Sequence, residues 1–302
     1  MLDEVRIAFD PNSQRLLNII LATMMFGVSL GLKPADFTRV FRAPKAPLSG
    51  LVAQFMLLPA LTCLLTVLVP MDPGIALGMI LVASCPGGSF SNVMTWMSRG
   101  NVAVSVSMTA TSSVAALIFT PLNFTFWGSV NPGTRELLSS IQVDGVQILQ
   151  LIVMVLGIPL LLGMLVGNYL PAISARIEPW LKKLSLLIFL LFVGIALGNN
   201  GELFLQYFTL FAGFVILHNA VALSIGWSAG QLLKLPTADR RAVMLEVGIQ
   251  NSGLGLIILF NFFPNQGGMM IITAFWGVWH LVSGLTLAGF WARRDHLALR
   301  LP

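Results

Sequence analysis

One acidic residue inside a long apolar stretch is the feature of this sequence best suited to chemistry. Glu246 is surrounded by apolar residues and is followed, about one helical turn later, by Gln250, Asn251 and Ser252. An ionised carboxylate near the middle of a bilayer costs roughly 2.5–3.5 kcal/mol on insertion scales, so such a group is normally paired, hydrated, protonated or bound to a cation. We therefore expect a functional site here. A neutral acid near a helix end is the simpler alternative.

A second apolar stretch contains an irregular segment at residues 84–92. Pro86 removes a backbone donor and blocks the carbonyl four residues earlier, and the two glycines after it admit conformations that other residues avoid. The sequence predicts a helix break here, and broken backbone at membrane depth requires surrounding protein or a watery cavity. The predicted hinge residues of the two stretches are Pro86, Gly87, Gly88, Gly248 and Gly253.

The two segments together offer oxygen ligands to a hard cation, which prefers such ligands. Glu246, Gln250, Ser91 and Asn92 carry suitable oxygens. Freed carbonyls and helix C-termini attract cations, whereas half-helix N-termini favour anionic groups. Most isolated Ser and Thr residues in such helices bond their own backbone, so we expect only a subset of nearby hydroxyls to act. These hydroxyl residues are Ser105, Ser107, Thr109, Thr111, Ser112 and Ser113.

The composition predicts which class of protein must position these groups. Of 302 residues, 56% are apolar and 10% are charged, whereas a soluble domain carries about 25% charged residues. This excludes a soluble cytosolic enzyme and predicts an all-α polytopic membrane protein in contact with lipid. The net charge of +5 is scattered over short loops, so no nucleic-acid partner is expected. Cys63 and Cys85 lack metal-ligand spacing.

The hydropathy pattern predicts nine membrane spans, because a bilayer core about 30 Å thick needs about 20 apolar residues in a helix. Spans one to four and six to nine form two sets, each with its irregular helix in third place. Because one extra span precedes the second set, the sets enter the membrane in opposite directions, as in an inverted repeat. The predicted spans are residues 14–32, 46–69, 73–98, 101–127, 145–170, 180–198, 205–233, 239–262 and 267–292.

The basic residues predict the orientation of these spans. With alternating spans, 14 of the 17 Lys and Arg residues fall on one side, and cytoplasmic loops collect such residues. We therefore expect a cytoplasmic C-terminus, an outside N-terminus and a location in the cell (inner) membrane. The cytoplasmic set is Lys33, Arg39, Arg42, Lys45, Arg99, Arg176, Lys182, Lys183, Lys234, Arg240, Arg241, Arg293, Arg294 and Arg300, and the opposite set is Arg6, Arg15 and Arg135.

The irregular segments resemble those of the bile acid:sodium symporter family. The matching stretches are residues 85–95, 99–103 and 246–253, and the resemblance extends over essentially the whole chain in span order. It implies one transporter unit over residues 1–302, in a nine-span form that lacks the first helix of ten-span relatives, with two broken helices that cross. It further implies a panel domain of residues 14–32, 145–170 and 180–198, and a core domain of residues 46–127 and 205–292.

The resemblance also implies ligand sets for two sodium ions and for a substrate. Val247 and Ile249 would lend backbone carbonyls. The first sodium site would comprise Ser91, Asn92, Ser105, Thr109 and Glu246. The second would comprise Gln54, Glu246, Val247, Ile249 and Gln250. The substrate would lie near Ser89, Asn251 and His280, although His280 is equally compatible with a packed core histidine and is followed by Leu281, where relatives carry Asn.

These features predict sodium-coupled secondary active symport of an organic anion, a bile acid or a smaller carboxylate, by alternating access. The alternative is a proton-coupled carrier or exporter of the same fold, in which Glu246 titrates. A passive channel is a further alternative. We do not expect an enzyme, because the spans contain no Ser–His pair, paired aspartates or His-Glu-x-x-His motif, and no phosphate-binding loop of the Gly-x-x-x-x-Gly-Lys type occurs. The sequence does not indicate the oligomeric state.

Overall fold

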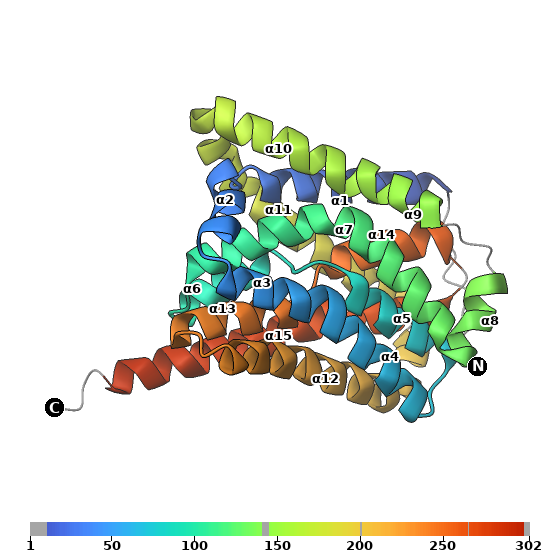
Figure 1. Cartoon of the computed structure of the whole chain (residues 1–302). Coiled ribbons are helices and arrows are strands. Elements are labelled where there is room, and N and C mark those ends of the chain that lie inside the picture. The colour runs from blue at the N-terminus through green and yellow to red at the C-terminus, as the bar shows by residue number, and fades with distance from the viewer. Residues whose placement is uncertain (1–10, 141–144, 200, 265, 299–302) are drawn as a thin grey trace.

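The computed structural model describes residues 11–140, 145–199, 201–264 and 266–298, so Arg6 and Arg300 lie outside the described residues. Helices dominate this part of the chain, which contains no β-strand (Figure 1). The elements are α1 (Pro11–Ser29), α2 (Pro34–Arg42), α3 (Lys45–Val52), η2 (Ala53–Leu57), α4 (Leu58–Leu68), α5 (Pro73–Ser84), α6 (Phe90–Met97), α7 (Val102–Val130), α8 (Pro132–Ser140), α9 (Gly145–Ile152), η3 (Val153–Gly157), α10 (Ile158–Tyr169), α11 (Pro171–Asn199), α12 (Gly201–Leu232), α13 (Thr237–Gly248), α14 (Ser252–Phe262) and α15 (Gly267–Ala298).

The structure confirms an all-α polytopic membrane protein. Each of the nine predicted spans coincides with one helix or with consecutive helical segments. Within the described residues, five helices are long and apolar enough to cross a membrane, and a sixth is formed if α1 and α2 are taken as one bent span. The count of nine spans therefore stays a prediction. The short helices α2 and α8 lie where the sequence analysis placed loops.

The third and eighth predicted spans are broken, as expected. The first break separates α5 from α6, and Cys85 there has the extended dihedral angles φ −75° and ψ 157°. The second break separates α13 from α14, and Ile249 has φ −110° and ψ 96°. The four resulting half-helices are 12, 8, 12 and 11 residues long. At 1.5 Å per residue, none of them alone spans a hydrocarbon core of about 30 Å.

The second predicted span contains a π-helical segment, η2, which has a local cause. Pro59 in the following turn has no N–H to donate to the carbonyl of Phe55 four residues earlier. Asn123 Nδ2 on α7 donates to that carbonyl instead, at 2.8 Å. The wider turn includes Gln54, whose side chain is only 1% exposed and belongs to the candidate site.

Helix packing places the breaks inside the molecule. Helix α1 packs against α10 and α11, while α5 packs against α7 and α15, and α12 packs against α13. The largest apolar cluster includes Leu77 and Leu81 from α5 and Ile257 from α14, all fully buried. Helices α1, α10 and α11 belong to the predicted panel, and the packed pairs of α5, α7, α15, α12 and α13 lie within the predicted core. The division into two domains stays a prediction.

One end of the molecule collects the helix ends that carry the predicted cytoplasmic bases. Helix α2, the start of α13 and the end of α15 lie together at the left of Figure 1, whereas α8 lies at the opposite end. We call the first of these the basic end. Its exposed bases include Lys33, Arg39 and Arg42 around α2.

Candidate functional site

The two helix breaks cross and bond to each other through their backbones. Gly88 N donates to Ile249 O at 2.6 Å, and Asn251 N donates to Pro86 O at 2.8 Å. Gly87 and Gln250 form an isolated antiparallel bridge between these bonds. These backbone groups released by the breaks therefore bond to each other, and side chains of other helices bond the carbonyls of Ser84, Cys85 and Gly248, which meets the requirement for broken helix inside a membrane.

The glycines at the crossover serve close approach rather than unusual dihedral angles. No glycine among the described residues has a positive φ. A Cβ atom on Gly87 would collide with Glu246 Oε1, and one on Gly88 would lie 2.8 Å from Gln250 O. Gly248 ends α13 and packs closely against Leu223 of α12, and the predicted hinge residue Gly253 lies within the first turn of α14.

A buried carboxylate lies beside the crossover. Glu246 is 1% exposed and accepts hydrogen bonds from three hydroxyl groups. Thr109 Oγ1 donates to Oε1 at 2.7 Å, Ser105 Oγ donates to Oε2 at 3.1 Å, and Ser91 Oγ also donates to Oε2. Ser105 and Thr109 are four residues apart, so they share one face of α7, while Ser91 comes from the first turn of α6.

Asn92, the remaining side chain of the first predicted ligand set, lies next to this carboxylate. The Thr109 hydroxyl is within 3.3 Å of Asn92 Oδ1 and within 3.1 Å of the Ser105 carbonyl. All five side chains of the set are thus linked by hydrogen bonds around Glu246. Three helices, α6, α7 and α13, supply the side chains that a cation here would need as ligands, and every candidate atom is an oxygen.

Gln54, Gln250 and Val247 of the second predicted ligand set form a further hydrogen-bond network at the crossover, whereas Glu246 is bonded in the first network. Gln54 Nε2 donates to Cys85 O at 2.8 Å and to Gln250 Oε1 at 2.7 Å, and Gln250 Nε2 donates to Val247 O at 2.7 Å. The Ile249 carbonyl accepts from Gly88 N. Among the described residues, no hydrogen-bond partner reaches Gln54 Oε1, a buried acceptor.

Polar anchors at the basic end hold the half-helices in register, and the sequence analysis missed them. Asn101 caps α7 and donates from Nδ2 to Asp239 Oδ1 of α13 at 2.8 Å. Arg241, predicted as a loop base, is 4% exposed and donates to both carboxylate oxygens of Asp295 at 2.6 and 3.0 Å and to Ser98 O at 2.6 Å. Its partners on α15 and just after α6 are remote in sequence, so no local signal distinguishes it from an exposed base.

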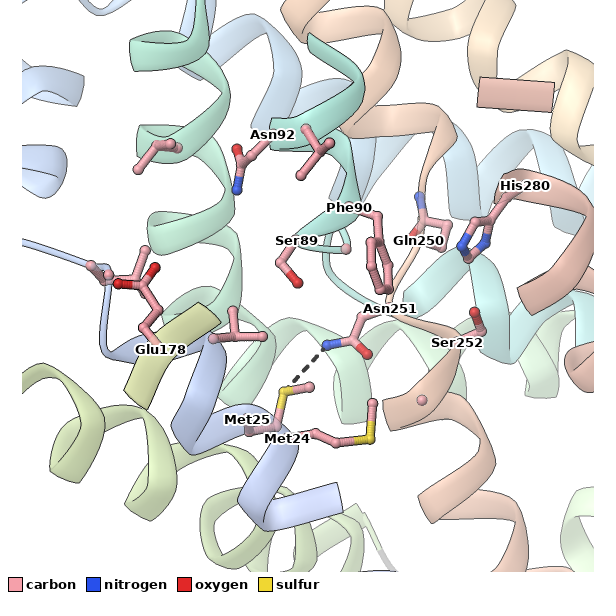
Figure 2. A pocket seen from close by; sticks show the side chains of 17 residues that line it. Met24, Met25, Ser89, Phe90, Asn92, Glu178, Gln250, Asn251, Ser252 and His280 are labelled. Carbon is pink, nitrogen blue, oxygen red and sulfur yellow. Dashed lines mark hydrogen bonds between the residues drawn. The ribbon is translucent and has the colours of Figure 1, made fainter. Parts of the chain in front are cut away.

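A cavity of about 340 Å³ adjoins the crossover (Figure 2). Ser89, Asn251 and His280, the three predicted substrate residues, all line it. Helix α1 contributes an apolar wall, and α11 contributes Glu178, neither of which the sequence analysis placed at the site. The wall residues on and just after α1 are Met24, Met25, Val28, Gly31 and Leu32.

Two half-helices begin at this cavity. Helix α6 starts after Ser89, whose side chain makes no capping bond, and α14 starts after Asn251, whose Oδ1 accepts from Leu254 N at 3.1 Å. Asn251 Nδ2 points toward Met25 Sδ, 3.6 Å away, and Figure 2 shows this contact. A thioether is a weak acceptor, so this amide retains donor capacity toward the cavity.

The two buried histidines differ in their bonding. His218 Nδ1 accepts from Trp276 Nε1 at 3.1 Å, and its Nε2 lies 2.8 Å from Thr62 Oγ1, so it ties α12 to α15 and α4. His280 packs against the Trp276 ring, and its Nδ1 has no hydrogen-bond partner among the described residues. We infer a packing role for His218, whereas His280 faces the cavity.

Known proteins with similar sequences point to one family. Residues 18–207 match the Sodium Bile acid symporter family. The chain is 32% identical over 282 residues to YocS, an uncharacterized sodium-dependent transporter of Bacillus subtilis, and the alignment covers 92% of this chain and 83% of that protein. It is 30% identical over 274 residues to the probable sodium/metabolite cotransporter BASS1 of Arabidopsis thaliana chloroplasts, with 90% of this chain and 66% of that protein covered.

A rice relative extends the similarity along the chain. The probable sodium/metabolite cotransporter BASS2 of Oryza sativa chloroplasts is 29% identical over 282 residues, which cover 92% of this chain and 64% of that protein. These alignments include both helix breaks, because they run along nearly all of the chain. The relatives named here are described as a sodium-dependent transporter and as probable sodium/metabolite cotransporters. Since the family match itself spans more than half of the residues, this protein belongs to the sodium bile acid symporter family.

Proposed function

We propose that this protein is a symporter that couples the inward movement of two sodium ions to that of one organic monoanion. The observation that carries this proposal is the Glu246 carboxylate, which is buried at the crossover and whose three hydrogen-bond donors are all hydroxyl groups. Membership in a sodium-coupled family supports the identity of the cation. Two sodium ions with one monoanion move net positive charge, so the membrane potential adds about 2.3 kcal/mol per charge per 100 mV.

The first sodium site uses Ser91, Asn92, Ser105, Thr109 and Glu246. Hydroxyl groups rotate readily, and the Thr109 hydroxyl has two further acceptors at hand in Asn92 and the Ser105 carbonyl. When its proton turns toward one of them, the oxygen presents a lone pair to the cation. The carboxylate then neutralises the ion, which removes the cost of a buried unpaired charge.

The second site uses Gln54, Gln250 and Glu246 with the carbonyls of Val247 and Ile249. Gln54 Oε1 is a buried acceptor with no partner among the described residues, which costs about 1–3 kcal/mol of stability. A cation bound at this oxygen would remove that cost. The amide nitrogens of Gln54 and Gln250 are already bonded within the network. The groups left to coordinate an ion are therefore Gln54 Oε1, which has no partner among the described residues, and the second lone pair of Gln250 Oε1, which already accepts from Gln54 Nε2.

The cavity favours an anion with an apolar body. Its described lining contains no Lys or Arg, and Glu178 is its one charged residue. The anion's charge is therefore held by the N-termini of α6 and α14, with the Ser89 hydroxyl and the Asn251 amide as donors. The apolar part of the molecule lies against Met24, Met25 and neighbouring residues of α1. This arrangement suits bile acids and smaller monocarboxylates and disfavours a second carboxylate near Glu178.

Sodium binding and anion binding are coupled because the sodium sites and the anion site both lie at the crossover. Ser91 of α6 and Glu246 of α13 already share a hydrogen bond, and a sodium ion bound to both fixes the two breaks in this arrangement. The N-termini that bind the anion begin within three residues of those breaks, so the anion site is complete only when sodium is bound. A panel of α1, α9, α10 and α11 then moves against the remaining helices and exposes the cavity to the other side.

Sodium dependence of ligand binding tests this proposal. Purified protein is heated with cholate or with pyruvate, in sodium or in potassium chloride at one pH. Sodium at about 100 times its Kd stabilises the folded state by about 2.7 kcal/mol, and we expect an anion to add to this only in sodium. Glu246→Gln should abolish both responses, whereas Glu136→Gln, an exposed acid on α8, should leave them intact. A response to pH with none to sodium would establish the proton-coupled alternative.

A pair of isosteric variants on α7 isolates the first site. Thr109→Val removes the hydroxyl that bonds Glu246, and we expect the apparent sodium affinity to fall roughly tenfold. Thr111→Val removes a hydroxyl that has no partner among the described residues, so the sodium affinity should be unchanged. Equal losses in the two variants would contradict the assignment of Thr109.

A further inference from the structure

Helix α1 is joined to α14 by a reciprocal pair of amide side chains. Asn18 Nδ2 donates to Asn261 Oδ1 at 3.1 Å, and Asn261 Nδ2 donates to Asn18 Oδ1 at 2.9 Å. Asn261 Nδ2 also donates to Ile257 O in its own helix, at 2.8 Å. The two asparagines are 243 residues apart in sequence, so the pair is a purely tertiary contact between two otherwise apolar helix surfaces.

The pair lies on the far side of the cavity from the basic end. Along α1 and the residues after it, the cavity lining runs from Met24 to Leu32, toward α2 and the basic end. Asn18 is six residues before Met24, about 9 Å along the helix axis. Asn261 is near the end of α14, and α14 leads away from the crossover. The cavity and the asparagine pair therefore follow one another along α1, with the pair farther from the basic end.

A reciprocal amide pair has two discrete arrangements, bonded and apart. In apolar surroundings each separated amide must find a new partner, so the bonded arrangement is favoured. Side-chain hydrogen bonds between membrane helices shift such equilibria by roughly three- to fifteen-fold. That is enough to bias two conformations and small enough for bound ligands to reverse.

We propose that the Asn18–Asn261 pair is a latch that holds α1 on α14, closes the cavity from the end opposite the basic end, and separates in each transport cycle. The inference rests on the proposed transport function, because only a carrier requires α1 and α14 to part. A pair that merely stabilised the fold would lower thermal stability when removed. It would not change the side from which the cavity is reached.

A thiol reporter in the cavity distinguishes these roles. Val28 lines the cavity, and Val28→Cys supplies the reporter, while Cys63 and Cys85 are buried, so the wild-type chain serves as the unreactive reference. The protein is placed in membrane vesicles of both orientations and exposed to a membrane-impermeant maleimide. In the reporter background, Asn18→Leu and Asn261→Leu should each raise the labelling rate from the end opposite the basic end, roughly three- to fifteen-fold.

The test includes a matched control variant and a second set of substitutions in case the leucine variants do not fold. Asn168→Leu removes an amide whose one hydrogen bond among the described residues is to Met164 O of its own helix, at 2.9 Å, so labelling should be unchanged. If a leucine variant does not assemble, Asn18→Ser and Asn261→Ser break the same pair with smaller polar side chains. Unchanged labelling from that end in variants at both positions overturns the latch. The labelling rate needs no transported substrate, so a failure of uptake would count against the proposed function alone.

Discussion

The two helix breaks meet at one crossover but have different causes. In the first break, Pro86 cannot donate to a helical carbonyl and is followed by two glycines, so the local sequence itself ends α5. The second break, at residues 249–251, contains neither proline nor glycine. The predicted hinge residues Gly248 and Gly253 flank it, but no residue within it prevents a continuous helix from α13 into α14.

The second break is held open by partners from elsewhere in the fold. Ile249 O accepts from Gly88 N, Asn251 N donates to Pro86 O, and Asn219 Nδ2 of α12 donates to Gly248 O at 2.8 Å. These bonds replace the helical bonds that the break gives up. The comparison teaches that one locally encoded break can impose a second one on a neighbouring segment by offering it backbone partners.

Isolated segments should show the largest difference between the two breaks. In detergent micelles, a peptide of residues 73–98 should keep its interruption after Ser84, whereas a peptide of residues 239–262 should form one continuous helix. Backbone chemical shifts and amide contacts measured by NMR report the helix of each peptide. An interruption at residues 249–251 in the second peptide alone would show that this break is local after all.

Closing the space between the breaks should destabilise the whole chain. Gly88→Ala places a Cβ atom 2.8 Å from the Gln250 carbonyl, which is backbone and cannot turn aside. We expect thermal unfolding to report a loss of about 1–3 kcal/mol. Gly255→Ala in α14 meets the Thr273 methyl at 3.2 Å, and a side chain can adjust, so its loss should be smaller. Equal losses would mean that the backbone pairing is not tight.

Removing the side chain that ties η2 to both breaks should mainly affect ion binding. Gln54→Leu keeps the volume but loses the bonds to Cys85 O and Gln250 Oε1, and we expect a roughly tenfold weaker sodium response. Gln150→Leu, on the exposed face of α9, is the matched change and should have no effect. Titration of thermal stability with sodium measures both variants.

The smallest effect is expected from the proline itself. Pro86→Ala restores a donor at this position, but the two backbone bonds to residues 249–251 remain. The free energy of unfolding should change by less than about 1 kcal/mol, although the same change in the isolated peptide of residues 73–98 should restore continuous helix. A collapse of the sodium response in the whole chain would show that the proline, rather than the pairing, maintains the crossover.

The sequence predicted which residues belong to the site better than it predicted how they are arranged. Glu246 was identifiable because an acid is costly in an apolar span, and Pro86 because a proline interrupts helical bonding. The role of Gly88 was mistaken for backbone freedom, since only the facing Gln250 carbonyl reveals the need for close approach. Arg241 looked like an ordinary loop base, because its carboxylate partner lies 54 residues later in the chain.

The sequence by itself determined an all-α membrane protein, the first helix break and the presence of a buried acid, because hydropathy, proline and charge act within a few residues of where they occur. The hinge glycines flanking the second break were also predicted, and the family resemblance grouped Ser91, Ser105 and Thr109 with Glu246. Only the tertiary structure decided which backbone groups hold the second helix open, that these three hydroxyls donate to Glu246, and which side of α1 lines the cavity. Those features depend on pairings between segments far apart in the chain, and a local pattern carries no information about which groups will meet.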